Sequence, residues 1–314
     1  MFCNLKQVAK TLKMINREYF PDVQGILHLE HFNFEGADHD LATIFFINGM
    51  GFTRDPYRRT DETNMGVNIG MQQFHLPRRG NPTPPFYGEV GLVVPDLPVI
   101  KARLERLAEI GKFDGTPYEL TPIDDTTMRI VSPFGVALKL HAAGSLDFLK
   151  PLGLAYVDIP VQPGKAVQLE KFYRDLVNTP TENLEIDGET TLSVTFGPHQ
   201  YVRFRERELD DYELYSYHVA YYVTNYNAYR DRVIEQGSLQ GEGAGQVFFF
   251  DGPFDPDSGE EILNFTQEVR SVYHPDFMRP LVNRWPIATE PFSDQRDVME
   301  SLADVPGLVY GTPK

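Results

Sequence analysis

Two kinds of hydrophobic periodicity alternate along the chain. Short runs rich in Val, Ile, Phe and Tyr, separated by Gly and Pro, predict β-strands and turns. Between these runs, apolar residues recur at helical spacing in four segments. They predict helices at about residues 38–48, 97–110, 165–177 and 225–236. Asp96 and Asn225 stand at the start of two of these segments, where both residue types are natural N-caps.

The pattern of the first half returns in the second half. Gly70 lies within Val67–Phe74 and Gly197 within Val194–Tyr201, and each glycine ends a strand-like run that resumes with Gln and an aromatic residue. These glycines are 127 residues apart. Three other pairs of segments repeat at similar offsets, and each half reads as strand, helix and short strands, twice over. The chain therefore predicts one βαβββ unit used four times.

This repeat predicts a domain organisation. We expect a first domain at 26–145 and a second at 150–270, each built from two units. An N-terminal helical extension at 1–25 precedes them, and it lacks the apolar core of a signal peptide. A C-terminal extension at 271–314 falls outside the pattern.

Composition and charge limit the classes of partner that the chain can bind. The 314 residues contain 29 Lys and Arg against 45 Asp and Glu, a net charge of −16, which disfavours nucleic acid and anionic lipid. A single cysteine, Cys3, excludes an internal disulfide and a Cys-based zinc site. No apolar run reaches the roughly 20 residues of a membrane span. We expect a cytoplasmic protein with a small-molecule substrate and no nucleic-acid or membrane partner, for which a homodimer is one option.

The pattern resembles the vicinal oxygen chelate superfamily, which includes glyoxalase I, extradiol dioxygenases and bleomycin-resistance proteins. The resemblance covers about residues 25–270. It implies an α+β fold in which four βαβββ modules form two cup-shaped half-barrels. It also implies that metal ligands come from the first and last strands of the two modules of a cup.

In the first half, the resemblance places His31, His75, Glu89 and Lys139 at these four positions. Two imidazoles and a carboxylate suit a divalent ion such as Fe, Zn, Mn, Ni or Co. His31, His75 and Glu89 are therefore the expected metal ligands. Lys139 cannot ligate when protonated, so it either contacts substrate, acts as a base, or pairs with Glu89.

Strand alternation adds two expectations. Gln73 shares a face with His75, where it either contacts substrate or makes a structural hydrogen bond. His28 and Glu30 fall on the face opposite His31 and are expected at the back of the sheet.

In the second half, the resemblance gives Tyr156, Val202, His218 and Leu263 as the equivalent positions. Only His218 is a good ligand, and Tyr156 and His218 are expected to bind substrate. The segment that ends at Glu268 is similar to the extradiol dioxygenase branch, which places His, His and Glu in this cup. Because two of those three are missing from the expected positions, isomerase, epimerase or lyase chemistry fits slightly better than dioxygenase chemistry.

We therefore expect a metal-dependent enzyme that acts on a small oxygenated metabolite chelated through two oxygens. The alternative is a metal-free binding protein of the drug-sequestering kind, in which a Lys139–Glu89 ion pair closes the first site. Lys139 is the residue that distinguishes the two hypotheses.

Overall fold

The computed structural model describes residues 25–36, 38–55, 63–78, 85–210, 214, 216–243 and 246–278. The expected N-terminal helix and nearly all of the C-terminal extension lie outside these residues. Within the described part of the chain, no helix combines the length and the apolar character that crossing a membrane requires.

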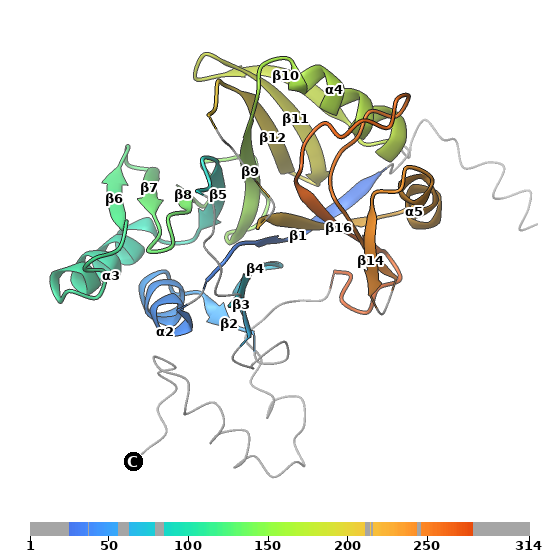
Figure 1. Cartoon of the computed structure of the whole chain (residues 1–314). Coiled ribbons are helices and arrows are strands. Elements are labelled where there is room, and N and C mark those ends of the chain that lie inside the picture. The colour runs from blue at the N-terminus through green and yellow to red at the C-terminus, as the bar shows by residue number, and fades with distance from the viewer. Residues whose placement is uncertain are drawn as a thin grey trace, which may run out of the picture.

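Four βαβββ modules follow one another along the chain (Figure 1). The first contains β1 (Ile26–Asn33), α2 (His39–Ala42), the π-helical η2 (Thr43–Gly49), β2 (Thr53–Arg54), β3 (Asn64–Ile69) and β4 (Gln72–Pro77). The second contains β5 (Glu89–Val94), α3 (Leu97–Glu109), β6 (Glu119–Pro122), β7 (Thr127–Val131) and β8 (Ala137–Ala142). The third contains β9 (Gly153–Val161), α4 (Lys165–Lys171), the π-helical η3 (Phe172–Val177), β10 (Thr181–Ile186), β11 (Glu189–Gly197) and β12 (Gln200–Glu206). The fourth contains β13 (His218–Val223), α5 (Tyr226–Glu235), β14 (Leu239–Gly243), β15 (Val247–Phe250) and β16 (Thr266–Ser271).

The modules assemble into two eight-stranded sheets that confirm the expected α+β class. Sheet A has the order β14-β15-β16-β13-β1-β4-β3-β2, and sheet B has the order β10-β11-β12-β9-β5-β8-β7-β6. Sheet A therefore joins the first and fourth modules, and sheet B joins the second and third. In Figure 1, β1 and β16 accordingly lie close together, with only β13 between them in the sheet.

This pairing corrects one expectation. The modules of each half do not close a cup with one another, because β1 pairs with β13 and β5 pairs with β9. Alternation of apolar and polar residues determines which face of a strand is buried, but not which strand lies beside it. The repeat is compatible with either pairing, so the pattern could not distinguish them.

The helical segments pack their apolar faces on the sheets. The aromatic pairs Phe45–Phe46 and Phe172–Tyr173 are fully buried, with ring centroids 4.8 and 5.1 Å apart. Asp96 accepts a hydrogen bond from the backbone amide of Val99, as its N-cap position predicts. Asn225 occupies the N-cap of α5 without a side-chain capping bond.

Candidate metal centre

Three strands of sheet A place two long polar side chains in register across one small residue. Ala220 of β13 pairs with His31 of β1 on one side and with Glu268 of β16 on the other. His218 lies two residues before Ala220 on β13 and so shares its face. Because Ala220 carries only a methyl group, the neighbouring side chains can meet above it.

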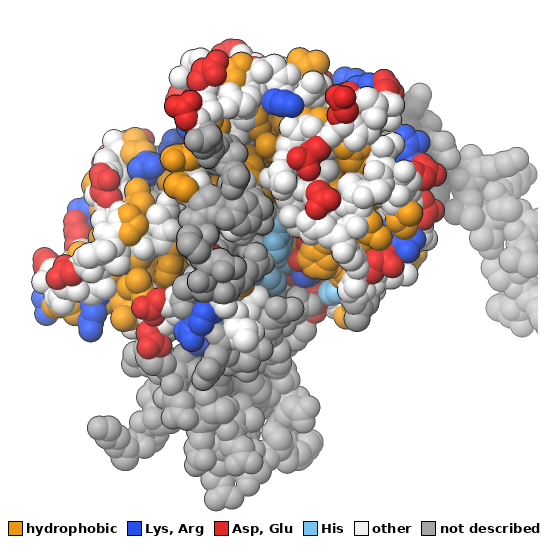
Figure 2. Space-filling model, in the orientation of Figure 1, with side chains coloured by type: hydrophobic (Ala, Val, Ile, Leu, Met, Phe, Trp, Pro, Cys, Tyr) orange, Lys and Arg blue, Asp and Glu red, His pale blue; other side chains and the backbone are white. Residues whose placement is uncertain are grey.

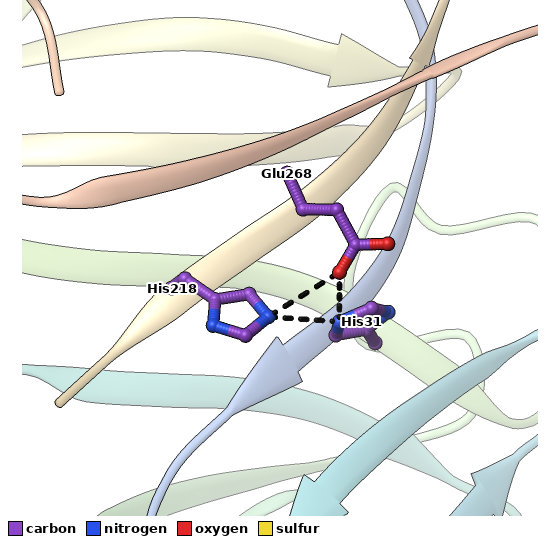
Figure 3. A group of neighbouring side chains, drawn as sticks. All are labelled: His31, His218 and Glu268. Atoms are coloured by element: carbon purple, nitrogen blue, oxygen red, sulfur yellow. Dashed lines mark hydrogen bonds and ion pairs between the residues drawn. The ribbon is translucent and has the colours of Figure 1, made fainter. Parts of the chain in front are cut away.

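Three potential ligand atoms converge there (Figure 3). His31 Nε2 lies 3.2 Å from His218 Nε2 and 3.3 Å from Glu268 Oε2. His218 Nε2 lies 3.5 Å from Glu268 Oε2. A divalent ion bound at about 2.1 Å holds ligands about 3 Å apart at right angles and about 3.4 Å apart at tetrahedral angles. The observed separations fall in or near this range.

A β-bulge brings Glu30 to the same group. The register between β1 and β13 shifts between Leu29 and His31, so Glu30 is an extra residue on β1. Its carboxylate accepts a hydrogen bond of 2.7 Å from His31 Nδ1. The expectation that Glu30 lies at the back of the sheet is therefore wrong, because strict alternation does not hold across a bulge.

Arg270 fixes both carboxylates. Its Nε and Nη2 atoms lie 2.6 and 2.5 Å from Glu268 Oε1, which leaves Oε2 directed at the two histidines. Its Nη1 lies 2.6 Å from Glu30 Oε2. Burial opposes the negative charge of both carboxylates, but Arg270 and His31 outweigh it and hold the pKa of Glu30 and of Glu268 below the ordinary value.

The donor set suits a shared cation. Because His31 Nδ1–H donates to Glu30, the neutral ring presents a lone pair at Nε2. That lone pair faces the nitrogen of His218 and the anionic oxygen of Glu268, so a proton on His218 Nε2 or a metal ion can be shared among the three atoms. Burial disfavours charge on His31, but Glu268 and Glu30 outweigh it and raise the pKa of His31. The residues present therefore fit a divalent ion.

His75 lies against this group without joining it. Its ring stacks on the ring of His31 with centroids 3.7 Å apart, and its Nε2 lies 2.9 Å from Gln73 Oε1. Gln73 Nε2 donates to Asp55 and Asn68, which makes its Oε1 an acceptor and His75 Nε2 a donor. Burial and the nearby charge of His31 lower the pKa of His75 well below its ordinary value. His75 is therefore a neutral imidazole whose Nδ1 carries no proton.

A cavity of about 490 Å³ opens above the three atoms. His218, Glu268, His75 and Arg270 line it, and Figure 2 shows histidine side chains in this hollow of the surface. Asn33 also lines it and is only 3% exposed, yet its Nδ2 has no hydrogen-bond partner among the described residues. The cavity therefore combines convergent ligands, a neutral base and an unused amide donor.

The structure separates the residues expected at the first site. His31 and His75 lie in sheet A, whereas Glu89 and Lys139 lie in sheet B. Glu89 Oε2 is 3.2 Å from Arg129 Nε, and no ion pair joins Glu89 to Lys139 in the described residues. Gln73 hydrogen-bonds to Asp55, Asn68 and His75, which agrees with the structural alternative expected for this residue. Tyr156 and His218 were expected to bind substrate in the second half. Tyr156 lies in sheet B, whereas His218 lies in sheet A beside His31.

Glu268 is the residue that the position-by-position comparison missed. Leu263 was expected at this position because it follows Gly259 by four residues, as Lys139 follows Gly135. However, β8 begins two residues after Gly135, whereas β16 begins seven residues after Gly259. The longer connection shifts the register by five residues and brings Glu268 to the inward position. The similarity of the segment ending at Glu268 to the extradiol branch was the signal that could have found it.

Comparisons with known proteins support the fold. No family model and no curated protein matches the sequence. Among solved structures, glyoxalase I from Zea mays aligns with a TM-score of 0.55 at 13% identity, over 81% of this chain and 95% of the other. A dioxygenase candidate from Bacillus subtilis aligns with a TM-score of 0.52 at 12% identity, over 89% and 97%. The likeness to these structures therefore confirms the expected glyoxalase-like fold.

Proposed function

We propose that this chain is a divalent-metal-dependent enzyme in which His31, His218 and Glu268 hold the ion. Its substrate is a small metabolite that presents two neighbouring oxygens. The observation that carries the proposal is the convergence of the three ligand atoms within 3.2–3.5 Å at the wall of a 490 Å³ cavity. Three protein ligands leave coordination positions for substrate oxygens, as a Lewis-acid catalyst requires.

The donor set favours dioxygenase chemistry. Two histidines and one carboxylate with open positions are the set that non-haem Fe(II) oxygenases use. The preference for isomerase or lyase chemistry depended on this set being incomplete, and Glu268 now completes it. We therefore propose Fe(II) as the metal and a vicinal diol as the substrate class.

Isomerase chemistry is the second candidate, and His75 is the observation that favours it. A neutral imidazole beside the ligands can remove a proton from a carbon atom next to a polarised oxygen. The likeness of the fold to glyoxalase I supports the same candidate.

The side chains around the cavity have distinct roles in this proposal. When bound, the divalent ion polarises two substrate oxygens and lowers the pKa of a substrate hydroxyl. His75 accepts the proton of that hydroxyl at Nδ1. Asn33 donates a hydrogen bond from Nδ2 to a substrate oxygen. Glu30 holds the tautomer of His31, and Arg270 keeps one oxygen of Glu268 directed at the histidines.

Metal analysis tests the proposal. The purified protein is loaded anaerobically with Fe(II), Mn(II) or Zn(II), freed of excess ion and measured for bound metal. We expect one ion per chain in the wild type and at least a hundredfold weaker binding in His218→Asn. His199→Asn is the matched control, because His199 lies outside the cavity and pairs with Asp147. Stoichiometric metal in His218→Asn would show that the centre lies elsewhere, and no metal in the wild type would favour the metal-free binding protein.

The reaction is tested on the loaded enzyme. We expect oxygen uptake when the Fe(II) form meets a panel of catechols, and loss of that uptake in Glu268→Gln. Absence of uptake, together with solvent deuterium entering an α-hydroxycarbonyl compound, would establish the isomerase candidate instead.

A further inference from the structure

Sheet B repeats the register of the metal centre with different side chains. Gly91 of β5 pairs with Tyr156 of β9 on one side and with Lys139 of β8 on the other. This is the arrangement of His31, Ala220 and Glu268 in sheet A. Glu89 lies two residues before Gly91, as His218 lies two residues before Ala220. We call the cup of sheet A the first cup and the cup of sheet B the second cup. At the three positions that hold the ligands in the first cup, the second cup presents Tyr156, Glu89 and Lys139.

The stacking interaction of the metal centre is also repeated. The guanidinium of Arg203 lies 3.7 Å from the centroid of the Tyr156 ring, and His75 stacks on His31 with centroids at the same distance. Arg203 and His75 occupy equivalent register positions, since each pairs with the residue two places after the stacked ring. The two cups thus share the same strand register and the same stacking interaction.

The two cups carry opposite charges on the last strand of a module, which is β16 in sheet A and β8 in sheet B. A carboxylate, Glu268, occupies this position in sheet A, and an ammonium, Lys139, occupies it in sheet B. A protonated lysine does not ligate a metal and repels one. The second cup is therefore not a second cation site. The positive charge of Lys139 at this position suits an anionic ligand.

A cavity of about 280 Å³ lies at this position. Glu89, Lys139, Asp158, Arg205 and Arg207 are among the residues that line it. Its volume is near the lower end of small-molecule pockets, so it suits a ligand of a few heavy atoms.

Among the described residues, Lys139 is the one cation lining this cavity that has no carboxylate partner. Arg129 pairs with Glu89, and Arg207 pairs with Glu189. Arg205 is held by several acceptors, which are Glu189, Asp187, Asp158 and the carbonyl oxygen of Ile186. In the described residues, no carboxylate lies within ion-pair distance of Lys139. One positive charge in the cavity is therefore left for a ligand.

A buried carboxylate oxygen that accepts no hydrogen bond accompanies this charge. Asp158 is 4% exposed and lines the cavity, and its Oδ1 accepts no hydrogen bond in the described part of the chain, although Arg203 Nε lies 3.6 Å from it as an ion-pair partner. Asp158 takes the register position of Asn33, whose Nδ2 lacks a partner in the metal cavity. A ligand that fills the second cavity should therefore donate a hydrogen bond as well as carry negative charge.

We propose that the second cup binds a small oxyanion, a carboxylate or a phosphate that also bears a hydroxyl group. Lys139 contacts the anionic oxygens, and Asp158 Oδ1 accepts the hydroxyl proton. This site does not depend on the metal centre, because every residue that forms it lies in or beside sheet B.

Titrations of the full chain test the site. The chelator-treated protein is titrated with glycolate, acetate and inorganic phosphate at pH 7 and constant ionic strength, and the amide signals of Gly88 and Glu89 are followed by NMR. We expect saturable shifts with glycolate or phosphate, and binding of glycolate at least threefold tighter than that of acetate. Glycolate without phosphate identifies a carboxylate ligand, and phosphate without glycolate identifies a phosphate ligand.

Variants attribute the binding to Lys139. We expect Lys139→Gln to weaken it at least tenfold, Lys139→Arg to retain it within threefold, and the exposed control Lys112→Gln to leave it unchanged. Linear shifts without saturation, or equal affinities in Lys139→Gln and the wild type, would overturn the proposal. Equal affinities for acetate and glycolate would overturn the role of Asp158. Removal of the metal before titration keeps a failure here separate from a failure of the proposed enzyme.

Discussion

His31 Nε2 and His218 Nε2 lie 3.2 Å apart, although 187 residues separate the two histidines along the chain. The contact exists because the first and last modules share one sheet, in which β1 and β13 are neighbours. A ligand set divided between the two ends of the described chain can form only after both ends have paired. We therefore expect integrity of the centre to report on assembly of the whole fold.

The charge of Glu268 should dominate metal affinity. We expect Glu268→Gln to lower affinity for Fe(II) or Mn(II) at least a hundredfold, because the amide keeps the shape but removes the only formal negative charge among the three ligands. Competition with a coloured chelator measures the change. Glu261→Gln is the matched control, because Glu261 lies on the connection before β16 and is exposed. Equal losses in the two variants would contradict the assignment of Glu268.

Glu30 should act on the metal through His31. Its carboxylate fixes the His31 ring by a bond of 2.7 Å, and partners of this kind typically contribute 10- to 100-fold to metal affinity. We expect Glu30→Gln to weaken metal binding within that range, whereas His31→Ala should abolish it. The same chelator competition resolves the two cases, and unchanged affinity in Glu30→Gln would show that the bulge has no role in positioning His31.

Gly91 should be essential for packing of the second cup. A Cβ atom at this position would lie 2.2 Å from the Tyr156 ring, whereas one at Gly241 of β14 would meet no atom within 4 Å. We expect Gly91→Ala to reduce the free energy of unfolding by about 1–3 kcal/mol, because the ring must shift within a packed sheet face. Gly241→Ala should change it by less than about 0.5 kcal/mol. Urea unfolding compares the two, and equal effects would contradict the close packing of Tyr156 on Gly91.

Asp158 should make stability depend on pH. Burial raises its pKa from 3.8 to about 6, and Glu89 adds to the rise, although Arg203 and Arg205 oppose it. The folded state therefore binds the proton more tightly than the unfolded state, so this contribution is complete below pH 4 and is lost as the pH rises through 6. A rise of the pKa from 3.8 to about 6 corresponds to about 3 kcal/mol.

The matching measurement compares wild type with Asp158→Asn, which cannot titrate at this position. The stability of the wild type relative to the variant should fall by about 2–3 kcal/mol between pH 4 and pH 7. Unfolding curves at several pH values provide the difference. A difference that is constant over this range would contradict the raised pKa.

Much of the local structure could be predicted from the sequence because it depends on neighbouring residues. The helix that begins after Asp96 and the aromatic pair Phe45–Phe46 follow from helical spacing and capping. His31 and His218 could be identified as candidate site residues because the resemblance to the superfamily places ligands at these positions of their strands. In contrast, Glu268 was hidden by a longer connection, and Glu30 by a bulge. Both features change the register without a clear trace in the hydrophobic pattern.

The sequence by itself determined the βαβββ unit, its four copies and the faces of most strands. These follow from periodicities that each segment carries on its own. Only the tertiary structure decided that the first module pairs with the fourth, and therefore that His31 meets His218 and Glu268 while Glu89 and Lys139 form a different cup. Strand pairing is a long-range choice between edges with similar hydrogen-bonding groups. Its outcome depends on the packing of the whole chain, which no local pattern contains.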